Sequence, residues 1–397
     1  MFQSWYKKFS SQAHQPFFSS GILFFILFMI LFILSYSRIL NLDTSVLTFH
    51  AYSMVFVVFI QFFLGFLFVV FPRFLAQAEI SSKVYMNQFI LYFLSSLGIF
   101  LSLIFFSKIT FVFQLMMLIS QILSFELLYS LHKKSLVKTK DDTKWVLISF
   151  ATGIVAHFLY IFSDIDMVYS YQLSKVAINS GFYLFIFMII FVISQRMIPF
   201  FTTAKVVDYK INKSTNLLFL VFAFLVLKVI LLSFDNAKLN LLADIPLLFI
   251  ITRELLKWKL PLFRVPAIMW VLYLGLYWIP VAFLISVIES IMAFYNPEFI
   301  FEKAVLHTIS LGYFLTVLVG FGTRVILGHS GSTPHADNFA IFIFVIIEFI
   351  TFLRVLSSFS LNFGLNYTFC INLTAIMLLI GLILWSSKYI TILLKGK

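Results

Sequence analysis

Twelve long apolar stretches divide this sequence, each bounded by charged or turn-forming residues. They cover residues 21–36, 46–71, 88–106, 109–131, 145–162, 176–193, 217–233, 239–252, 266–292, 304–321, 339–359 and 367–385. Most reach the roughly 17–25 residues that a helix needs to cross a bilayer, and the eighth, which holds Asp244 and Pro246, is the weakest assignment. Because 62% of the residues are hydrophobic and 11% are charged, we predict an all-α, polytopic membrane protein. We expect about twelve transmembrane helices in one transmembrane domain over residues 1–397.

The placement of the basic residues predicts the orientation of these helices. Of the 28 Lys and Arg residues, 21 lie in the terminal segments and the even-numbered loops, whereas the odd-numbered loops hold six. Lys and Arg accumulate on the cytoplasmic side of membrane proteins. We therefore predict that both termini are cytoplasmic, and we attribute the net charge of +12 to orientation rather than to nucleic-acid binding.

A single cysteine and several missing motifs exclude whole classes of site. Cys370 alone is incompatible with a disulfide framework and with a thiolate-bound zinc or iron–sulfur centre. The sequence contains no GxGxxG, P-loop, Cys-x-x-Cys or His-Glu-x-x-His motif. It therefore indicates no enzyme class, and whether the protein is catalytic stays open.

Three of the seven histidines fall at one depth in the predicted membrane. His50, His157 and His307 each lie one to two turns inside the outer end of a helix, the second, fifth and tenth respectively. Two helical imidazoles that face each other across a bundle can supply both axial ligands of a b-type haem. The alternative is that each histidine only hydrogen-bonds a neighbouring helix. We prefer His50 and His307 as the ligand pair and keep His157 in reserve.

Two cations share this outer layer. Lys228 and Arg354 lie five residues from the outer ends of the seventh and eleventh helices. Buried basic side chains at this level could neutralise the two propionates of a haem. The alternative is that these long side chains snorkel to the lipid headgroups. Glu289, near the outer end of the ninth helix, is another potential partner for either cation. A propionate contact is the hypothesis for both, and for Lys228 taken alone snorkelling is the preferred interpretation.

A second polar cluster marks the cytoplasmic face. Arg196 precedes Pro199 at the end of the sixth helix, and Arg324 and His329 follow the tenth helix among glycines. Irregular backbone at membrane depth is tolerated where it is packed in protein or lines a polar cavity. These three side chains could hold an anion, a cofactor or a metal, or they could form an orientation anchor followed by a turn.

Five segments, in order along the chain, resemble the NnrS family. The opening H-Q-P-F-F at 14–18 is similar to the family's R-P-F-F, and F-H-A-Y-S-M at 49–54 is similar to its W-H-A-H-E-M. Further on, R-M-I-P-F-F-T at 196–202 resembles R-V-I-P-F-F-T, W-V-L-Y-L-G at 270–275 resembles W-V-L-H-L-G, and A-V-L-H at 304–307 with T-R-V and G-H-S-G downstream resembles A-L-H…T-R-V…L-G-H-T-G. The resemblance implies a bacterial inner-membrane protein that binds haem and copper and takes part in nitric oxide metabolism and resistance to nitrosative stress.

The chain departs from the family's pattern at three potential ligands. Tyr52 and Ser53 replace the second His and the Glu of H-A-H-E-M, and Tyr273 replaces the His of L-H-L-G. If the replaced groups bind copper in relatives, this chain binds haem b without copper. His50, His307 and His329 remain as candidate metal ligands.

Two other function classes compete with the haem protein. A secondary transporter would have a similar helix count, but it would carry a charged residue near the membrane midplane, where this sequence is mostly Phe, Leu and Ile. A membrane subunit that handles a metal or cofactor without binding haem would use its histidines only for packing. The expected partners are membrane lipid and either nitric oxide or a redox protein.

Overall fold

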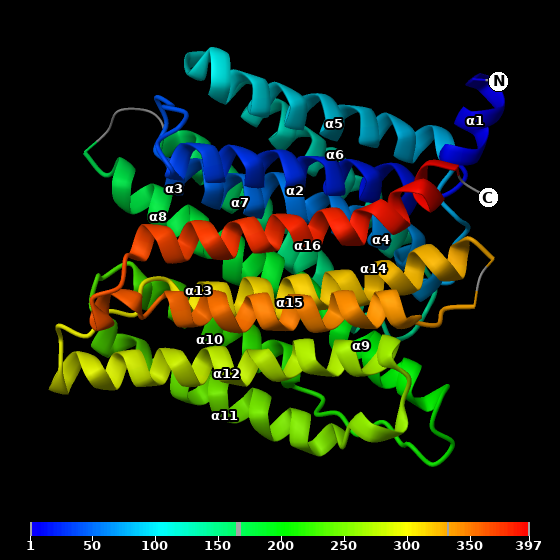
Figure 1. The fold of residues 1–397 in the computed structure, drawn as a ribbon. Helices are drawn as coiled ribbons and strands as arrows, with labels where there is room; N and C mark the ends of the chain where they lie inside the picture. Colours follow the sequence, from blue (N-terminus) through cyan, green and yellow to red (C-terminus); the bar gives the residue numbers. More distant parts are fainter. Residues whose placement is uncertain (1, 164–167, 332, 396–397) are drawn as a thin grey trace. The chain divides into compact units, whose positions relative to one another are not determined.

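The structure is a computed structural model that describes residues 2–163, 168–331 and 333–395, and all regular secondary structure in these ranges is helical. The chain divides into two compact units, the first comprising Met1–Ile189 and Ser386–Lys397 and the second Ile190–Trp385. The helices of the first six spans are α1 (Phe2–Phe9), α2 (His14–Tyr36), α3 (Val46–Tyr52), η1 (Ser53–Val58), α4 (Phe59–Phe74), α5 (Ser82–Phe105), η2 (Ser107–Ile109), α6 (Thr110–Lys134), α7 (Asp141–Ser163), α8 (Ser170–Ser180), η3 (Gly181–Phe187) and α9 (Met188–Thr203), of which α9 crosses into the second unit. Figure 1 shows, for example, α5 and α6 side by side in the first unit.

The second unit continues with helices of similar length. They are α10 (Leu217–Leu232), η4 (Ala237–Asn240), α11 (Leu241–Trp258), η5 (Leu262–Arg264), α12 (Ala267–Tyr295), α13 (Ala304–His307), η6 (Thr308–Leu315), α14 (Thr316–His329), α15 (Asn338–Ser357), η7 (Ser360–Phe363) and α16 (Tyr367–Lys395). Apolar runs of this length adopt helices because lipid cannot hydrogen-bond the backbone, so each N–H and C=O must be satisfied within the segment. Lys259, with φ of 48°, ends α11 in the left-handed region.

The helices confirm an all-α membrane protein with about twelve spans. In the described residues, ten helical segments are long and apolar enough to cross a membrane. Two more helices correspond to the seventh and eighth predicted spans: α10 has 16 residues, and α11 has 18 residues that include Asp244 and Pro246. These two helices pack against each other. The weakest prediction from the sequence is therefore a helix in the structure.

The two ends of the chain meet within the first unit. Trp5 of α1 donates a hydrogen bond from Nε1 to the carbonyl oxygen of Leu394 in the last turn of α16, at 2.8 Å. Chain ends on the same side of a membrane require an even number of crossings. This contact agrees with twelve spans and with termini that share one side.

Three spans contain a π-helical segment in the described part of the chain. These segments are η1 in the second span, η3 in the sixth and η6 in the tenth, so they recur at an interval of four spans. In the first unit η1 and η3 pack together, and a Cβ added at Gly181 would lie 2.7 Å from Val55 and 2.8 Å from Phe56. A side chain at position 181 would thus force the two segments apart. π-helical segments are rare and often mark functional sites.

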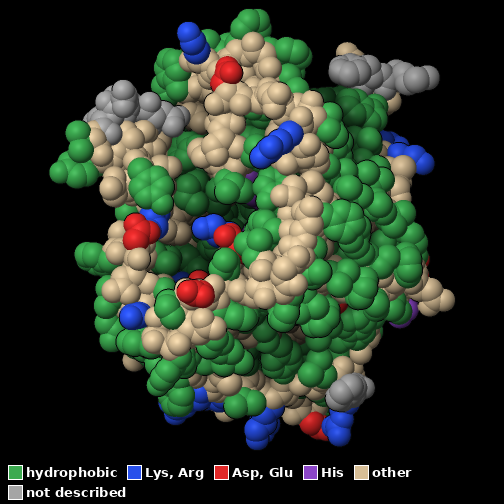
Figure 2. All heavy atoms as spheres, turned by 60° about the vertical axis from the view of Figure 1, so that its left-hand side comes forward, with side chains coloured by type: hydrophobic (Ala, Val, Ile, Leu, Met, Phe, Trp, Pro, Cys, Tyr) green, Lys and Arg blue, Asp and Glu red, His purple; other side chains and the backbone are tan. Residues whose placement is uncertain are grey.

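The exposed side chains along the helices are mostly apolar, as in a protein surrounded by lipid. Figure 2 shows one face on which hydrophobic side chains predominate and charged side chains are few. Large apolar residues such as Phe219, Phe249 and Phe349 are more than half exposed along the helices. Such a surface matches the apolar solvent that the hydropathy of the segments requires.

The orientation of the helices leads to a labelling prediction. Cysteine introduced at Leu136 or Val207, which are 96% and 97% exposed in loops on the predicted cytoplasmic side, should be hidden from a membrane-impermeant maleimide in intact cells. Cysteine at Tyr295, which is 84% exposed at the opposite end of α12, should be labelled without opening the cells. The background is a Cys370→Ser variant, because Cys370 is the chain's single native cysteine. The reverse labelling pattern would invert the topology.

Candidate functional site

His157 lies at the centre of a closed hydrogen-bond network in the first unit. Its Nε2 accepts a hydrogen bond from the Tyr52 hydroxyl at 2.8 Å, and its Nδ1 lies 2.8 Å from Oε1 of Gln121. The Nε2 of Gln121 in turn donates to the carbonyl oxygen of Phe56, within η1, at 3.2 Å. The imidazole is fully buried and stacks on the Phe56 ring with the centroids 4.6 Å apart. The network joins α7, α6 and the π-helical segment of the second span.

The network also determines which nitrogen of the His157 ring carries the proton. Gln121 uses its amide N–H on Phe56, so its oxygen accepts the proton on Nδ1 of His157, and Nε2 is left to accept from Tyr52. Every polar atom along this line then has a partner and no charge is needed. Because both ring nitrogens are engaged, a metal could bind His157 only after one of these bonds is broken. His157 therefore acts in this structure as a link between helices.

His50 lies on α3, three residues before η1 begins. Its ring is half-buried and packs on Phe32 of α2, with the centroids 4.5 Å apart. Its carbonyl oxygen accepts a hydrogen bond from the Ser53 hydroxyl at 3.1 Å. The ring is thus held against the neighbouring helix at the start of the π-helical segment.

His307 and Arg354 come together in the second unit, as the sequence placed them at one depth. Nδ1 of His307 lies 3.0 Å from the carbonyl oxygen of Lys303, one turn earlier. The Nη2 of Arg354 lies 3.2 Å from Nδ1 and 3.3 Å from Nε2 of the same ring. Arg354 is 7% exposed, and its Nη1 donates to the Ser358 hydroxyl at 2.9 Å. The imidazole of His307 and the buried guanidinium of Arg354 therefore lie against each other, directly before η6.

Lys228, which the sequence suggested for a propionate, has a protein partner. Its ammonium lies 2.6 Å from Oδ1 of Asp244 and donates to the Ser286 hydroxyl at 3.2 Å, and that hydroxyl donates to Oδ2 of Asp244 at 2.6 Å. Lys228 and Asp244 are both almost completely buried. The ion pair and its hydrogen bonds thus join three side chains, one each from α10, α11 and α12. This closed ion pair explains how a short helix with an acidic residue fits among the spans.

In the inner cluster, the Arg324 side chain makes two contacts. Its guanidinium carbon lies 3.9 Å from the centroid of the Phe201 ring, a cation–π geometry, and its Nη1 lies 3.9 Å from the Met269 sulfur. Arg196 on α9 and His329 at the end of α14 are half-buried. The anion, cofactor or metal suggested for these three side chains remains a prediction.

The positions at which the chain departs from the family's pattern are all occupied by hydroxyl groups in protein contacts. Tyr52 bonds His157, Ser53 bonds the carbonyl of His50, and the Tyr273 hydroxyl lies 2.7 Å from the hydroxyl of Thr202. Across the described residues, no three His, Cys, Asp or Glu side chains converge on a point that could hold a metal ion. The hydroxyl groups of Tyr52 and Tyr273 thus link helices, whereas that of Ser53 bonds the backbone of its own span.

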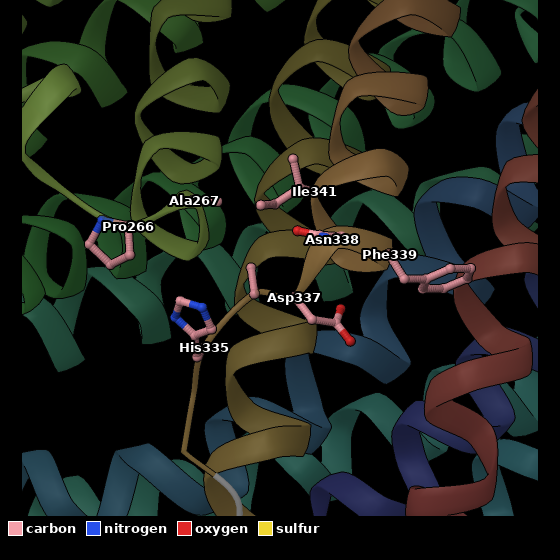
Figure 3. Close-up of a pocket in the computed structure, with 8 residues that line it drawn as sticks. Pro266, Ala267, His335, Asp337, Asn338, Phe339 and Ile341 are labelled. Carbon is pink, nitrogen blue, oxygen red and sulfur yellow. The ribbon is translucent and has the colours of Figure 1, made fainter.

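A cavity of about 580 Å³ lies at the start of α12 and the loop before α15. Figure 3 shows the ring of His335 near Pro266, with the carboxylate of Asp337 turned away from it. Asp337 accepts a hydrogen bond from the backbone N–H of Ala340 and so caps α15. None of the site residues predicted from the sequence lines this hollow.

Glu348 is a polar residue that the sequence analysis did not single out. It lies near the middle of α15, where Oε2 accepts from Nε1 of Trp278 at 2.6 Å and Oε1 lies 2.9 Å from the Thr316 hydroxyl. One acidic residue inside an otherwise apolar run was the available signal. The partner role of Asp244 was also missed, because depth along a helix does not reveal which way a side chain faces.

The His157 network predicts a difference between two glutamines of one helix. Gln121→Leu leaves Nδ1 of His157 and the Phe56 carbonyl without their partner, so it should destabilise the protein by about 1–3 kcal/mol for each group. Gln114 is the matched control on α6, because it is also buried but its Oε1 forms no hydrogen bond. Thermal unfolding of the detergent-purified variants measures both. Equal losses for Gln114→Leu and Gln121→Leu would contradict the network.

The closed ion pair predicts a rescue by a second substitution. Lys228→Met leaves Asp244 as an uncompensated buried charge, and such losses cost about 3–5 kcal/mol. Adding Asp244→Leu removes that charge, so the double variant should unfold at a higher temperature than Lys228→Met alone. If the two losses simply add, the pair is not coupled as the geometry requires.

Comparison with known proteins gives the family of this chain. The model of the family described as "NnrS protein" matches residues 8–397, nearly the whole sequence. No curated protein matches the chain. Because the match covers all twelve spans and both units, the chain belongs to the NnrS family.

Proposed function

We propose that this protein is a haem-binding protein of the bacterial inner membrane that acts in the response to nitric oxide. Membership in the NnrS family suggests the nitric oxide response. The haem is supported by the surroundings of His307, which carry the proposal. Membrane lipid and either nitric oxide or a redox protein are the partners that this function implies.

The hydrogen bond of His307 fits an iron ligand. Metal-bound histidines almost always donate their second ring N–H to a carboxylate, a backbone carbonyl or water, which fixes the tautomer and the ring orientation. The Lys303 carbonyl, 3.0 Å from Nδ1, provides this acceptor, and Nε2 becomes the ligand atom once the Arg354 guanidinium, whose Nη2 lies 3.3 Å from it, turns away. Arg354 lies against the same ring, so a carboxylate of a group bound there would be within reach of its guanidinium.

His50 is proposed as the second ligand. This pairing rests on the sequence, in which His50 of the first unit and His307 of the second share one depth and each precede a segment that is π-helical, by three residues and one residue respectively. His157 is left out because its ring is completely buried and bonded through its nitrogens to Tyr52 and Gln121, whereas the His307 ring is half-exposed. Lys228 is left out as a propionate partner because Asp244 and Ser286 surround its ammonium.

Copper does not fit the residues present. Imidazole suits copper, whereas positions 52, 53 and 273 here carry hydroxyl groups that already bond His157, the His50 carbonyl and Thr202. We propose that this chain binds haem without a copper ion at these positions. When bound, a haem supplies one-electron chemistry and, where an axial ligand leaves, a position for nitric oxide.

Absorption spectroscopy of the detergent-purified protein tests this function. The wild type should show the Soret band of a b-type haem, and His307→Ala should lose it because the iron loses the ligand that Lys303 orients. His50→Ala should open one coordination position, so that the reduced form binds carbon monoxide. His335→Ala is the control, since His335 is exposed in a loop, and it should keep the full spectrum. A colourless wild type would reject the haem, and a His307→Ala variant with the full spectrum would reject the ligand.

Secondary transport is the second candidate, and one observation favours it. Transporters carry ionisable residues near the membrane midplane, and Glu348 lies near the middle of its span. Movement of a solute by proteoliposomes that contain the haem-free protein would support this function over the haem protein.

A further inference from the structure

We propose that Glu348 is a proton-binding site inside the membrane: an uncharged carboxylic acid that exchanges its proton with water. Glu348 is the eleventh of the 20 residues of α15, so roughly 15 Å of helix separates it from either end of the span. Ionisable residues at this depth are costly to bury and commonly belong to proton or ion pathways. The proposed haem function makes no use of this residue.

The carboxyl group is held by two neutral partners. The indole Nε1 of Trp278 on α12 donates to Oε2 at 2.6 Å, and the Thr316 hydroxyl at the start of α14 lies 2.9 Å from Oε1. No ion pair among the described residues involves Glu348. A carboxylate in lipid without a cation would carry a desolvation cost of several kcal/mol. The surroundings therefore favour the protonated acid.

Counting protons on the Thr316 hydroxyl leads to the same conclusion. The Thr316 oxygen lies 2.9 Å from Glu348 and 3.2 Å from the Leu311 carbonyl, but a hydroxyl has one proton to donate. If Glu348 is ionised, the Thr316 hydroxyl donates its proton to the carboxylate, and its hydrogen bond to the Leu311 carbonyl is lost. If Glu348 is protonated, its O–H donates to Thr316, whose own proton goes to Leu311. The protonated acid satisfies every contact at once.

No other charge lies close enough to decide the charge of Glu348. Tyr277, next to Trp278, and Tyr313, three residues before Thr316, are the nearest titratable groups along the helices that pack with α15. The nearest acidic or basic groups other than tyrosine are Arg354, six residues on, Glu289, 11 residues beyond Trp278, and Arg324 and His307, eight and nine residues from Thr316. At 1.5 Å per residue these offsets are about 9, 16, 12 and 13 Å along the axes. Hydrogen bonds, rather than an ion pair, thus surround this carboxyl group.

The closed ion pair of the same unit shows what a purely structural carboxylate looks like. Asp244 is completely buried, and both of its oxygens are bonded to Lys228 or Ser286. Glu348 has no cation partner among the described residues and is half-buried, and its exposed part lies at a depth where the surroundings are lipid. Its partner Thr316 directly follows the π-helical segment η6. A neutral acid at mid-depth, held by hydrogen bonds to uncharged side chains, is the arrangement that a proton-binding site requires.

Infrared spectroscopy of the purified protein tests the proposal without any assay of activity. The wild type should show the carbonyl stretch of a protonated carboxylic acid, and this band should shift when the protein is transferred to D₂O. Glu348→Gln should lose the band but fold, because the amide can donate to Thr316 and accept from Trp278. Glu289→Gln, on the outer part of α12, is the matched control and should keep it.

Two results would overturn the proposal. An unchanged acid band in Glu348→Gln would mean that Glu348 is ionised, and a band that resists exchange in D₂O after long incubation would mean that Glu348 is a sealed structural link. Thr316→Val provides a second variant in case Glu348→Gln does not fold. It removes one hydrogen bond to the acid and should move the band of a protonated Glu348, whereas an unmoved band would count against the proposal.

Discussion

The cost of placing polar groups in lipid determines how this protein is assembled. A buried polar side chain in the spans is costly unless it finds its partners within the protein, because lipid offers none. The His157 network, the Lys228–Asp244 pair and the contact of Arg354 with His307 are three solutions to this constraint. Each joins side chains of different spans, so the same contacts that satisfy polar groups also help to specify which helices are neighbours.

The architecture could be predicted because it follows from hydropathy and charge alone. Apolar length defines a span, and the distribution of Lys and Arg defines the side. The short eighth span was the weakest assignment because Asp244 lowers its hydropathy, and the structure shows that Lys228 of the preceding helix compensates that charge. The contact between Trp5 and Leu394 agrees with the even count. Local composition was therefore enough for the number of helices, and the cytoplasmic side of the termini stays a prediction.

The candidate site was harder to predict because the depth of a residue in the membrane does not tell which neighbouring helix its side chain faces. Residue numbers placed His157 at the depth of the other two histidines, yet only the fold shows that Tyr52 and Gln121 engage its ring. The midplane was judged apolar because most residues there are Phe, Leu and Ile, and Glu348 was overlooked among them. Both cases depend on the rotation of a helix about its axis. A single sequence without a regular polar stripe does not reveal that rotation.

The π-helical segments have a consequence for that rotation. An α-helix turns by about 100° per residue, and a π-helical bulge amounts to one extra residue in the turn. In the second and tenth spans, η1 and η6 therefore turn the residues before them relative to the rest of the helix. The directions of His50 and His307 depend on this one-residue insertion. Deleting a single residue from either segment would redirect the imidazole while leaving every amino acid around it unchanged.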